Sequence, residues 1–150
     1  MERAVGCLLA VSLFALMSAA NAAVAHPGVP LRDPTVYAGL WQGDTDQGYP
    51  YSTRVSSSGK LTKVRVQFDI QGSGGCVLRE TATWTGAKPI KDDHFRIHID
   101  DVGGSATIQG DFVHKSVAKG TYRGTSNTSS GCAGHAEGTW RATKSPVPTP

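Results

Sequence analysis

Residues 62–70 read TKVRVQFDI, and apolar and polar side chains alternate through the whole stretch. One side of an extended chain here would carry Val64, Val66, Phe68 and Ile70, and the other Lys63, Arg65, Gln67 and Asp69. A period of two over nine residues is typical of a β-strand with one buried face. Residues 94–100 (HFRIHID) repeat the pattern, so the two stretches predict two strands of an antiparallel sheet.

Shorter stretches on both sides of these two show the same alternation more weakly. They predict six further strands over residues 38–45, 49–55, 76–85, 105–113, 117–125 and 133–142. The segments between them are short and rich in glycine, serine and aspartate, which are turn-forming residues. No segment has the 3.6-residue apolar stripe of a helix. The chain is therefore predicted to be all-β, with about eight short antiparallel strands in a flattened barrel or a sandwich.

The large side chains indicate which face of each weaker strand points inward. They place inside Trp41, Tyr51, Val55, Leu78, Trp84, Ile108, Phe112, Tyr122 and Trp140. The inward positions of the last two strands are mostly small, namely Ala118, Gly120, Gly124, Gly134, Ala136 and Gly138. Small residues facing large ones predict a mostly filled interior. A cavity for one small molecule is the alternative, because eight-stranded barrels include both cases.

The N-terminal segment predicts export. Arg3 precedes an apolar run over residues 4–17, and small residues follow up to Ala25. This is the pattern of a secretory signal peptide over residues 1–25, with cleavage after Ala22 or after Ala25. The run is shorter than the roughly 20 apolar residues of a membrane span, so no span is expected in the mature chain. We predict a secreted or periplasmic protein with a flexible leader (26–36), a β domain (37–144) and a Pro-rich tail (145–150).

Export leaves two cysteines in the mature chain, Cys76 and Cys132. An even pair in an oxidising compartment predicts a disulfide, and two buried free thiols are the alternative. The fourth and eighth strands of a round eight-stranded barrel lie opposite each other, whereas a disulfide joins Cα atoms only about 5.5 Å apart. The bond therefore requires glycine-rich loops that fold over one end, or a flattened body.

Several short motifs resemble known families. Residues 39–43 (GLWQG) resemble the G-x-W that opens lipocalin- and avidin-like up-and-down barrels. The chain is also similar to small exported bacterial β-barrel or β-sandwich proteins, which pair an opening W-x-G with a late I-x-G-x-F, here residues 108–112. A G-C (131–132) and a closing T-W-x-A (139–142) complete the likeness, which spans residues 38–144. It implies a barrel or sandwich but assigns no binding residue, and the N-terminal 3₁₀ turn and C-terminal helix usual in lipocalins are not visible.

Charge and motif content exclude several functions. Fifteen Lys and Arg oppose twelve Asp and Glu, which gives a net charge of +3 that is scattered along the sequence. A nucleic-acid partner would call for a basic cluster, so none is predicted. The motifs G-x-S-x-G, H-E-x-x-H and the P-loop are absent. The sequence favours a non-catalytic exported module that binds a small molecule, a glycan or a protein.

Two residues are candidates for ligand binding. Tyr49 is expected to be exposed near an open rim of the barrel, beside the Gly/Ser-rich loops. Glu80 falls on the inward side of its strand, between Leu78 and Ala82. A carboxylate at such a position is more often explained by a β-bulge or by an ion pair with Arg79 or Arg123 than by a function.

Metal and cofactor sites are not predicted. His94 and His98 share a strand face but lie about 13 Å apart, too far to bind one metal ion together. A structural zinc site would need the two thiols that form the disulfide. The alternative function is a small secreted enzyme or a copper-binding protein. In that case cleavage after Ala25 would make His26 the first residue, and its amine and imidazole would chelate copper with a second histidine.

Overall fold

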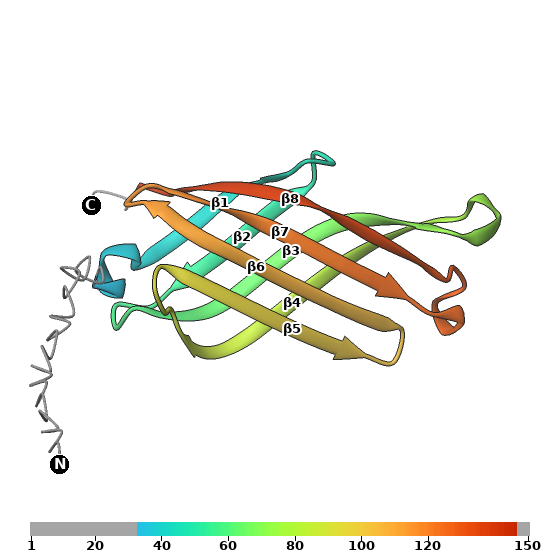
Figure 1. Cartoon of the computed structure of the whole chain (residues 1–150), viewed down its shortest axis with the longest axis horizontal. Coiled ribbons are helices and arrows are strands. Elements are labelled where there is room, and N and C mark those ends of the chain that lie inside the picture. The colour runs from blue at the N-terminus through green and yellow to red at the C-terminus, as the bar shows by residue number, and fades with distance from the viewer. Residues whose placement is uncertain (1–32, 147–150) are drawn as a thin grey trace, which may run out of the picture.

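The computed structural model describes residues 33–146. This part folds into the strands β1 (Gly39–Thr45), β2 (Pro50–Val55), β3 (Lys60–Gly72), β4 (Val77–Pro89), β5 (His94–Asp101), β6 (Gly104–His114), β7 (Val117–Ser126) and β8 (Gly134–Lys144) (Figure 1). Three 3₁₀ turns accompany them, η1 (Pro34–Tyr37), η2 (Ser73–Gly75) and η3 (Thr128–Ser130). The all-β prediction is confirmed, and each strand lies within a few residues of its predicted position.

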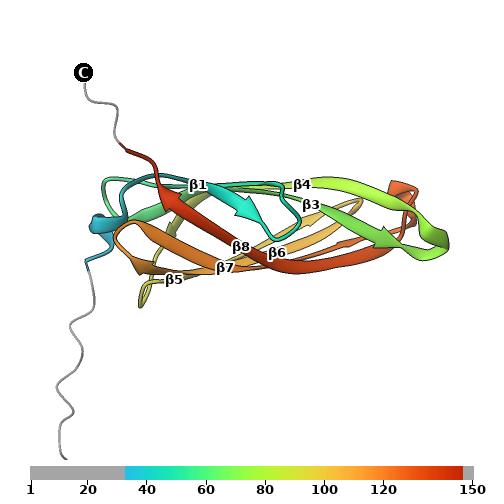
Figure 2. The same cartoon turned by 90° about the horizontal axis from the view of Figure 1, so that it is seen from above.

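All eight strands belong to one sheet in the order β4-β3-β2-β1-β8-β7-β6-β5. Most strands pair antiparallel with their neighbours in the chain, and β1 also pairs with β8, which rolls the sheet around its core. Seen from above, the body is flat, as predicted (Figure 2). The exception to neighbour pairing is β4 with β5, which are linked at their connecting loop by the bridge Lys91–His94. The barrel is therefore open along these two edges.

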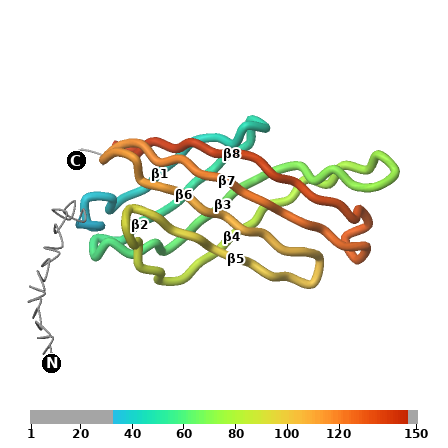
Figure 3. The backbone as a smooth tube through the Cα atoms, viewed as in Figure 1, coloured from blue at the N-terminus to red at the C-terminus, as the bar shows by residue number. Residues whose placement is uncertain are grey.

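The disulfide lies where two long hairpins meet. The β3–β4 and β7–β8 hairpins extend beyond the β1–β2 turn (Figure 3), and there β3 pairs directly with β8 through Gln71–His135 and Gly72–Gly134. This pairing brings Cys76 and Cys132 together, with their Cα atoms 5.9 Å apart and their sulfurs bonded. The predicted disulfide is confirmed. The fourth and eighth strands do not lie on opposite sides of the barrel here. At this end β3 pairs with both β4 and β8 and so brings them close together.

Aromatic side chains fill the interior. Tyr51 stacks on Trp140 with ring centroids 3.9 Å apart, and Phe112 contacts both Tyr37 and Trp41 at 4.5 and 5.0 Å. Most residues predicted to point inward are buried, including Val55, Ile108 and Tyr122. Two predicted core residues of β4, Leu78 and Trp84, are only half-buried. The reason is that β4 borders the opening, so its inner face is not fully covered.

The predicted flexible leader is wrong for residues 33–36. Asp33 caps η1 by accepting a hydrogen bond from the Thr35 amide at 2.9 Å, and Pro34 supplies the fixed φ that favours a helical first turn. Tyr37 is fully buried, and its hydroxyl donates to Asp93 Oδ1 at 2.8 Å. The domain thus begins with an N-terminal 3₁₀ turn that sequence patterns did not reveal.

The ends of the chain lie partly beyond the described region. Ser145, the first residue of the predicted Pro-rich tail, donates its amide hydrogen to the Leu40 carbonyl at 2.8 Å and so belongs to the domain. The predicted signal peptide, its two cleavage sites and His26 fall outside the described residues, as do residues 147–150. Within residues 33–146, no helix has the length and apolar character needed to cross a membrane.

Candidate functional site

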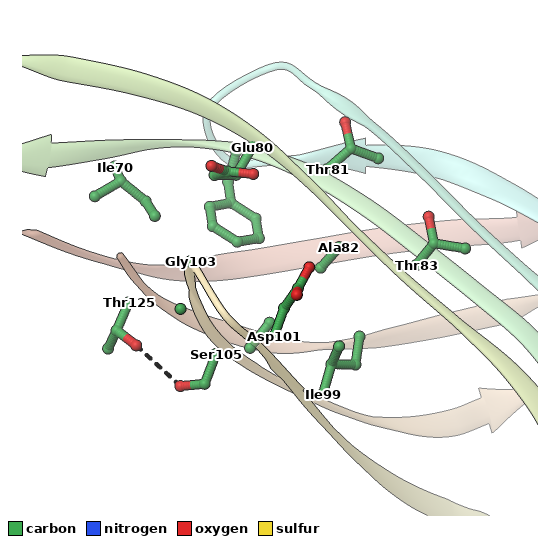
Figure 4. Close-up of a pocket in the computed structure, with 13 residues that line it drawn as sticks. Ile70, Glu80, Thr81, Ala82, Thr83, Ile99, Asp101, Gly103, Ser105 and Thr125 are labelled. Atoms are coloured by element: carbon green, nitrogen blue, oxygen red, sulfur yellow. Dashed lines mark hydrogen bonds between the residues drawn. The ribbon is translucent and has the colours of Figure 1, made fainter. Parts of the chain in front are cut away.

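The opening between β4 and β5 forms a pocket of about 280 Å³ (Figure 4). The Lys91–His94 bridge closes the turn between the two strands, and beyond this turn no ladder pairs β4 with β5. The pocket draws its lining from β3, β4, β5, β6 and β7, namely Phe68, Ile70, Glu80, Thr81, Ala82, Thr83, Ile99, Asp101, Gly103, Gly104, Ser105, Ala106 and Thr125. It is therefore a gap in the barrel wall that reaches the core.

The pocket combines an apolar floor with an acidic rim. Phe68 and Ile70 are buried beneath it, and Ile99 is half-buried at its side. Glu80 approaches from β4 and Asp101 from β5 (Figure 4). The lining contains no lysine, arginine or histidine, so its two carboxylates have no cation beside them in the pocket. An apolar surface next to uncompensated negative charge is suited to a ligand that is partly apolar and partly cationic.

The expected explanation for Glu80, a bulge or an arginine partner, is wrong. Glu80 pairs in regular register with Phe68, so the strand is not bulged at this point. Arg79 points to the outer face and forms an ion pair with Asp69, with Nε 3.0 Å from Oδ1. Arg123 pairs with Glu137 at 3.1 Å. Glu80 faces the pocket, half-buried and without an ion pair among the described residues.

Tyr49 lies away from the pocket. Its hydroxyl donates to Asp69 Oδ2 at 2.6 Å, and the Arg79 guanidinium lies over its ring, 4.4 Å from the centroid. The hydrogen bond to Asp69 raises the pKa of Tyr49. The expectation of an exposed Tyr49 is therefore wrong, because the side chain is half-buried in this cluster. Its partners Asp69 and Arg79 alternate with the inward residues of β3 and β4, so the sheet separates Tyr49 from Glu80.

Sequence reasoning missed Asp101. It stands at the end of β5, next to a turn, where an aspartate is ordinary. It shares a pocket with Glu80 only because β4 and β5 are unpaired at this end. No local pattern records that gap, since both strands have the alternation of paired ones.

The outer cluster predicts a pH dependence of stability. Hydrogen bonds from Arg79 and then from Tyr49 lower the pKa of Asp69 below its ordinary value. A carboxyl with a lowered folded-state pKa stabilises the fold above its unfolded pKa of about 4, and this contribution is lost as the pH falls through the folded value. Near pH 6, the free energy of unfolding measured in urea should be larger for wild type than for Asp69→Asn. The difference should shrink below about pH 4.

Arg79→Gln is the matched variant for this prediction, because it removes the largest cause of the shift and leaves the carboxyl in place. Its deficit relative to wild type should shrink over the same pH range. A deficit of either variant that stays constant down to pH 2 would show that the cluster acts through packing and not through the charge of Asp69.

The histidines among residues 33–146 lie on the outer face of the sheet. His94 Nδ1 is 2.8 Å from Asp111 Oδ1, and His98 lies between Thr107 and Asp100. Among residues 33–146, no three His, Cys, Asp or Glu side chains gather in a way that would hold a metal ion. The copper alternative requires His26, which lies outside these residues.

Comparison with protein-family models, with curated proteins and with solved structures gives no match to this chain, so the pocket is interpreted from its own geometry and chemistry.

Proposed function

We propose that the chain is an exported, non-catalytic binding module that takes a small, partly apolar molecule with an amine or quaternary ammonium group into the pocket between β4 and β5. The observation that carries the proposal is Glu80. This carboxylate faces inward at the break in the barrel wall, and neither nearby arginine pairs with it. A cationic ligand could therefore form an ion pair with Glu80 without displacing an existing partner.

The shape and chemistry of the pocket support this class of ligand. A volume of about 280 Å³ lies just below the range of about 300–1,000 Å³ that is usual for small-molecule pockets, and so suits a compound of metabolite size or smaller. The cationic group would lie between Glu80 and Asp101, and the apolar part would cover Phe68 and Ile99. The facing edges of β4 and β5 also offer backbone N–H and C=O groups that no strand ladder uses.

Thermal unfolding with a panel of ligands tests the proposal. We expect small alkylamines and quaternary ammonium compounds to raise the melting temperature, because a ligand bound only to the native state stabilises it. Neutral and anionic analogues of the same shape should not. In Glu80→Gln the shift should fall by at least half, and in Glu80→Gln with Asp101→Asn it should disappear. Glu137→Gln, which removes an outer-face carboxylate, is the matched control and should respond as wild type does.

Three results would contradict the proposal. One is the absence of any amine-dependent shift, and another is an equal shift in Glu80→Gln and Glu137→Gln. The third is turnover. Two carboxylates in one pocket favour the second candidate function, a small glycoside hydrolase, which would release phenol from aryl glycosides and lose that activity in Glu80→Gln.

The proposed location and the copper alternative are tested by the exported protein itself. Intact mass of protein recovered from the periplasm or the culture medium should show cleavage after Ala22 or Ala25 and the loss of two hydrogens at the disulfide. If His26 is the first residue and copper raises the melting temperature, the copper-binding function replaces the present proposal.

A further inference from the structure

The outer face of β2 and β3 gathers four cations that look scattered in the sequence. Arg54 of β2 stands directly opposite Lys63 of β3, and Arg65 follows Lys63 on the same face. Lys60 lies at the start of β3, and all four residues are exposed. We call Arg54, Lys60, Lys63 and Arg65 the basic face. Cross-strand pairing creates this face, so it has no counterpart in a run of basic residues along the sequence.

No carboxylate lies in the cross-strand rows that hold the centre of this face. One row consists of Leu40, Arg54, Lys63 and Thr85, and the next of Gln42, Ser52, Arg65 and Thr83. None of the four cations forms an ion pair with another described residue. The opposite side of the barrel differs, because its cationic cross-strand pair, Lys119 and Arg141, has an acid on each side in the same row, Asp111 on β6 and Asp44 on β1.

The pairing of Arg54 with Lys63 has an energetic cost. Like charges directly opposite each other on neighbouring strands have Cβ atoms about 5 Å apart and destabilise the sheet. Along β3, Lys63 and Arg65 are separated by about 7 Å. A flat array of positive charges at 5–7 Å intervals matches a linear polymer with regularly spaced negative groups, which would relieve the repulsion when it binds.

We propose that the basic face binds an acidic polysaccharide, carboxylated or sulfated. The side chains that flank the cations, Gln42, Ser52, Thr83 and Thr85, carry the amide and hydroxyl groups that hydrogen-bond sugar hydroxyls. A bilayer surface is less well matched, because the exposed large apolar residues, Val36, Val77, Val102 and Val113, lie outside these two rows. The two rows also contain no aromatic side chain for base stacking, which single-stranded nucleic acid would use.

Titration of the folded domain with heparin and with polygalacturonate tests this proposal. We expect the triple variant Arg54→Ser/Lys63→Ser/Arg65→Ser to bind at least about ten-fold more weakly, and its salt dependence to be shallower by about one unit of slope for each lost contact. The matched control is Arg96→Ser/Lys119→Ser/Arg141→Ser, which removes the same charge from the opposite side and should bind within about two-fold of wild type. The Glu80 pocket remains intact in both variants, so amine binding there is scored separately.

Stability gives an independent readout. Because Arg54→Ser removes a like-charge pair, its urea midpoint should equal or exceed that of wild type. The proposal is overturned if both triple variants weaken binding equally, which would show an effect of net charge alone. It is also overturned if neither polysaccharide binds at 50 mM salt, or if duplex DNA or phosphatidylglycerol vesicles bind more tightly than both polysaccharides.

Discussion

Replacing Cys76 and Cys132 together by serine is expected to lower the free energy of unfolding by about 4 kcal/mol, because the disulfide closes a long loop in the unfolded chain. The two cysteines are 56 residues apart in sequence. The loop that the bond closes contains β4, β5, β6 and β7. The bond joins the β3–β4 hairpin to the β7–β8 hairpin in the region beyond the β1–β2 turn. Urea unfolding followed by tryptophan fluorescence measures the loss.

Reduced wild type is the control, since it should unfold at the same urea concentration as the double serine variant, and reductant should leave the variant unchanged. Gly72→Ala gives a second test in the oxidised protein. A Cβ at Gly72 would overlap both sulfurs, so this substitution should weaken the junction while both cysteines remain. A loss below about 1 kcal/mol in the double variant would show that the β3–β8 pairing, and not the covalent bond, holds this end.

Alternation in the sequence predicted the strands because each buries one face. Val64, Val66 and Phe68 point inward, and their neighbours are exposed or half-buried. The way the strands close could not be predicted, since it depends on unequal hairpin lengths. Just before β2 begins, the side-chain amide of Gln47 takes the place of a strand beside β3: its Oε1 accepts from the Asp69 amide at 2.7 Å, and its Nε2 donates to the Asp69 carbonyl. Two residues later, β8 continues the pairing. A side chain that replaces a strand leaves no periodic signal.

The same distinction explains what was predicted of the candidate sites. The inward direction of Glu80 follows from alternation, and the structure has it inward. Its lack of a partner depends on Arg79 and Arg123 pairing elsewhere, which is a tertiary outcome. The basic face likewise depends on the register that sets Arg54 opposite Lys63. A register shift of one residue would place a different side chain there, so composition alone cannot locate the face.

Trp140→Ala is expected to cost about 3–5 kcal/mol, as for other large aromatic truncations in a core. The indole is 2% exposed, stacks on Tyr51 with centroids 3.9 Å apart, and donates from Nε1 to the Thr121 carbonyl at 3.3 Å. Gly110 and Gly120 lie against its edge, and a Cβ at either position would overlap Cζ2. Urea unfolding followed by tryptophan fluorescence measures the loss, because Trp41 and Trp84 still provide a signal in the variant.

The two glycines give this prediction a matched pair of controls. Gly110→Ala should cost about 1–3 kcal/mol by overpacking, and combining it with Trp140→Phe should cost less than the sum of the two single changes, since the smaller ring vacates the overlap. Gly120→Ala should not be rescued in this way, because its Cβ also overlaps the Gln109 carbonyl oxygen, which belongs to the neighbouring strand and cannot rotate aside. Equal rescue at both positions would show that backbone movement, and not the indole ring, absorbs the added methyl group. If the losses of Gly110→Ala and Trp140→Phe are additive, the indole ring does not lie against Gly110. The packing of small residues against large ones, on which the filled interior depends, would then be contradicted at this position.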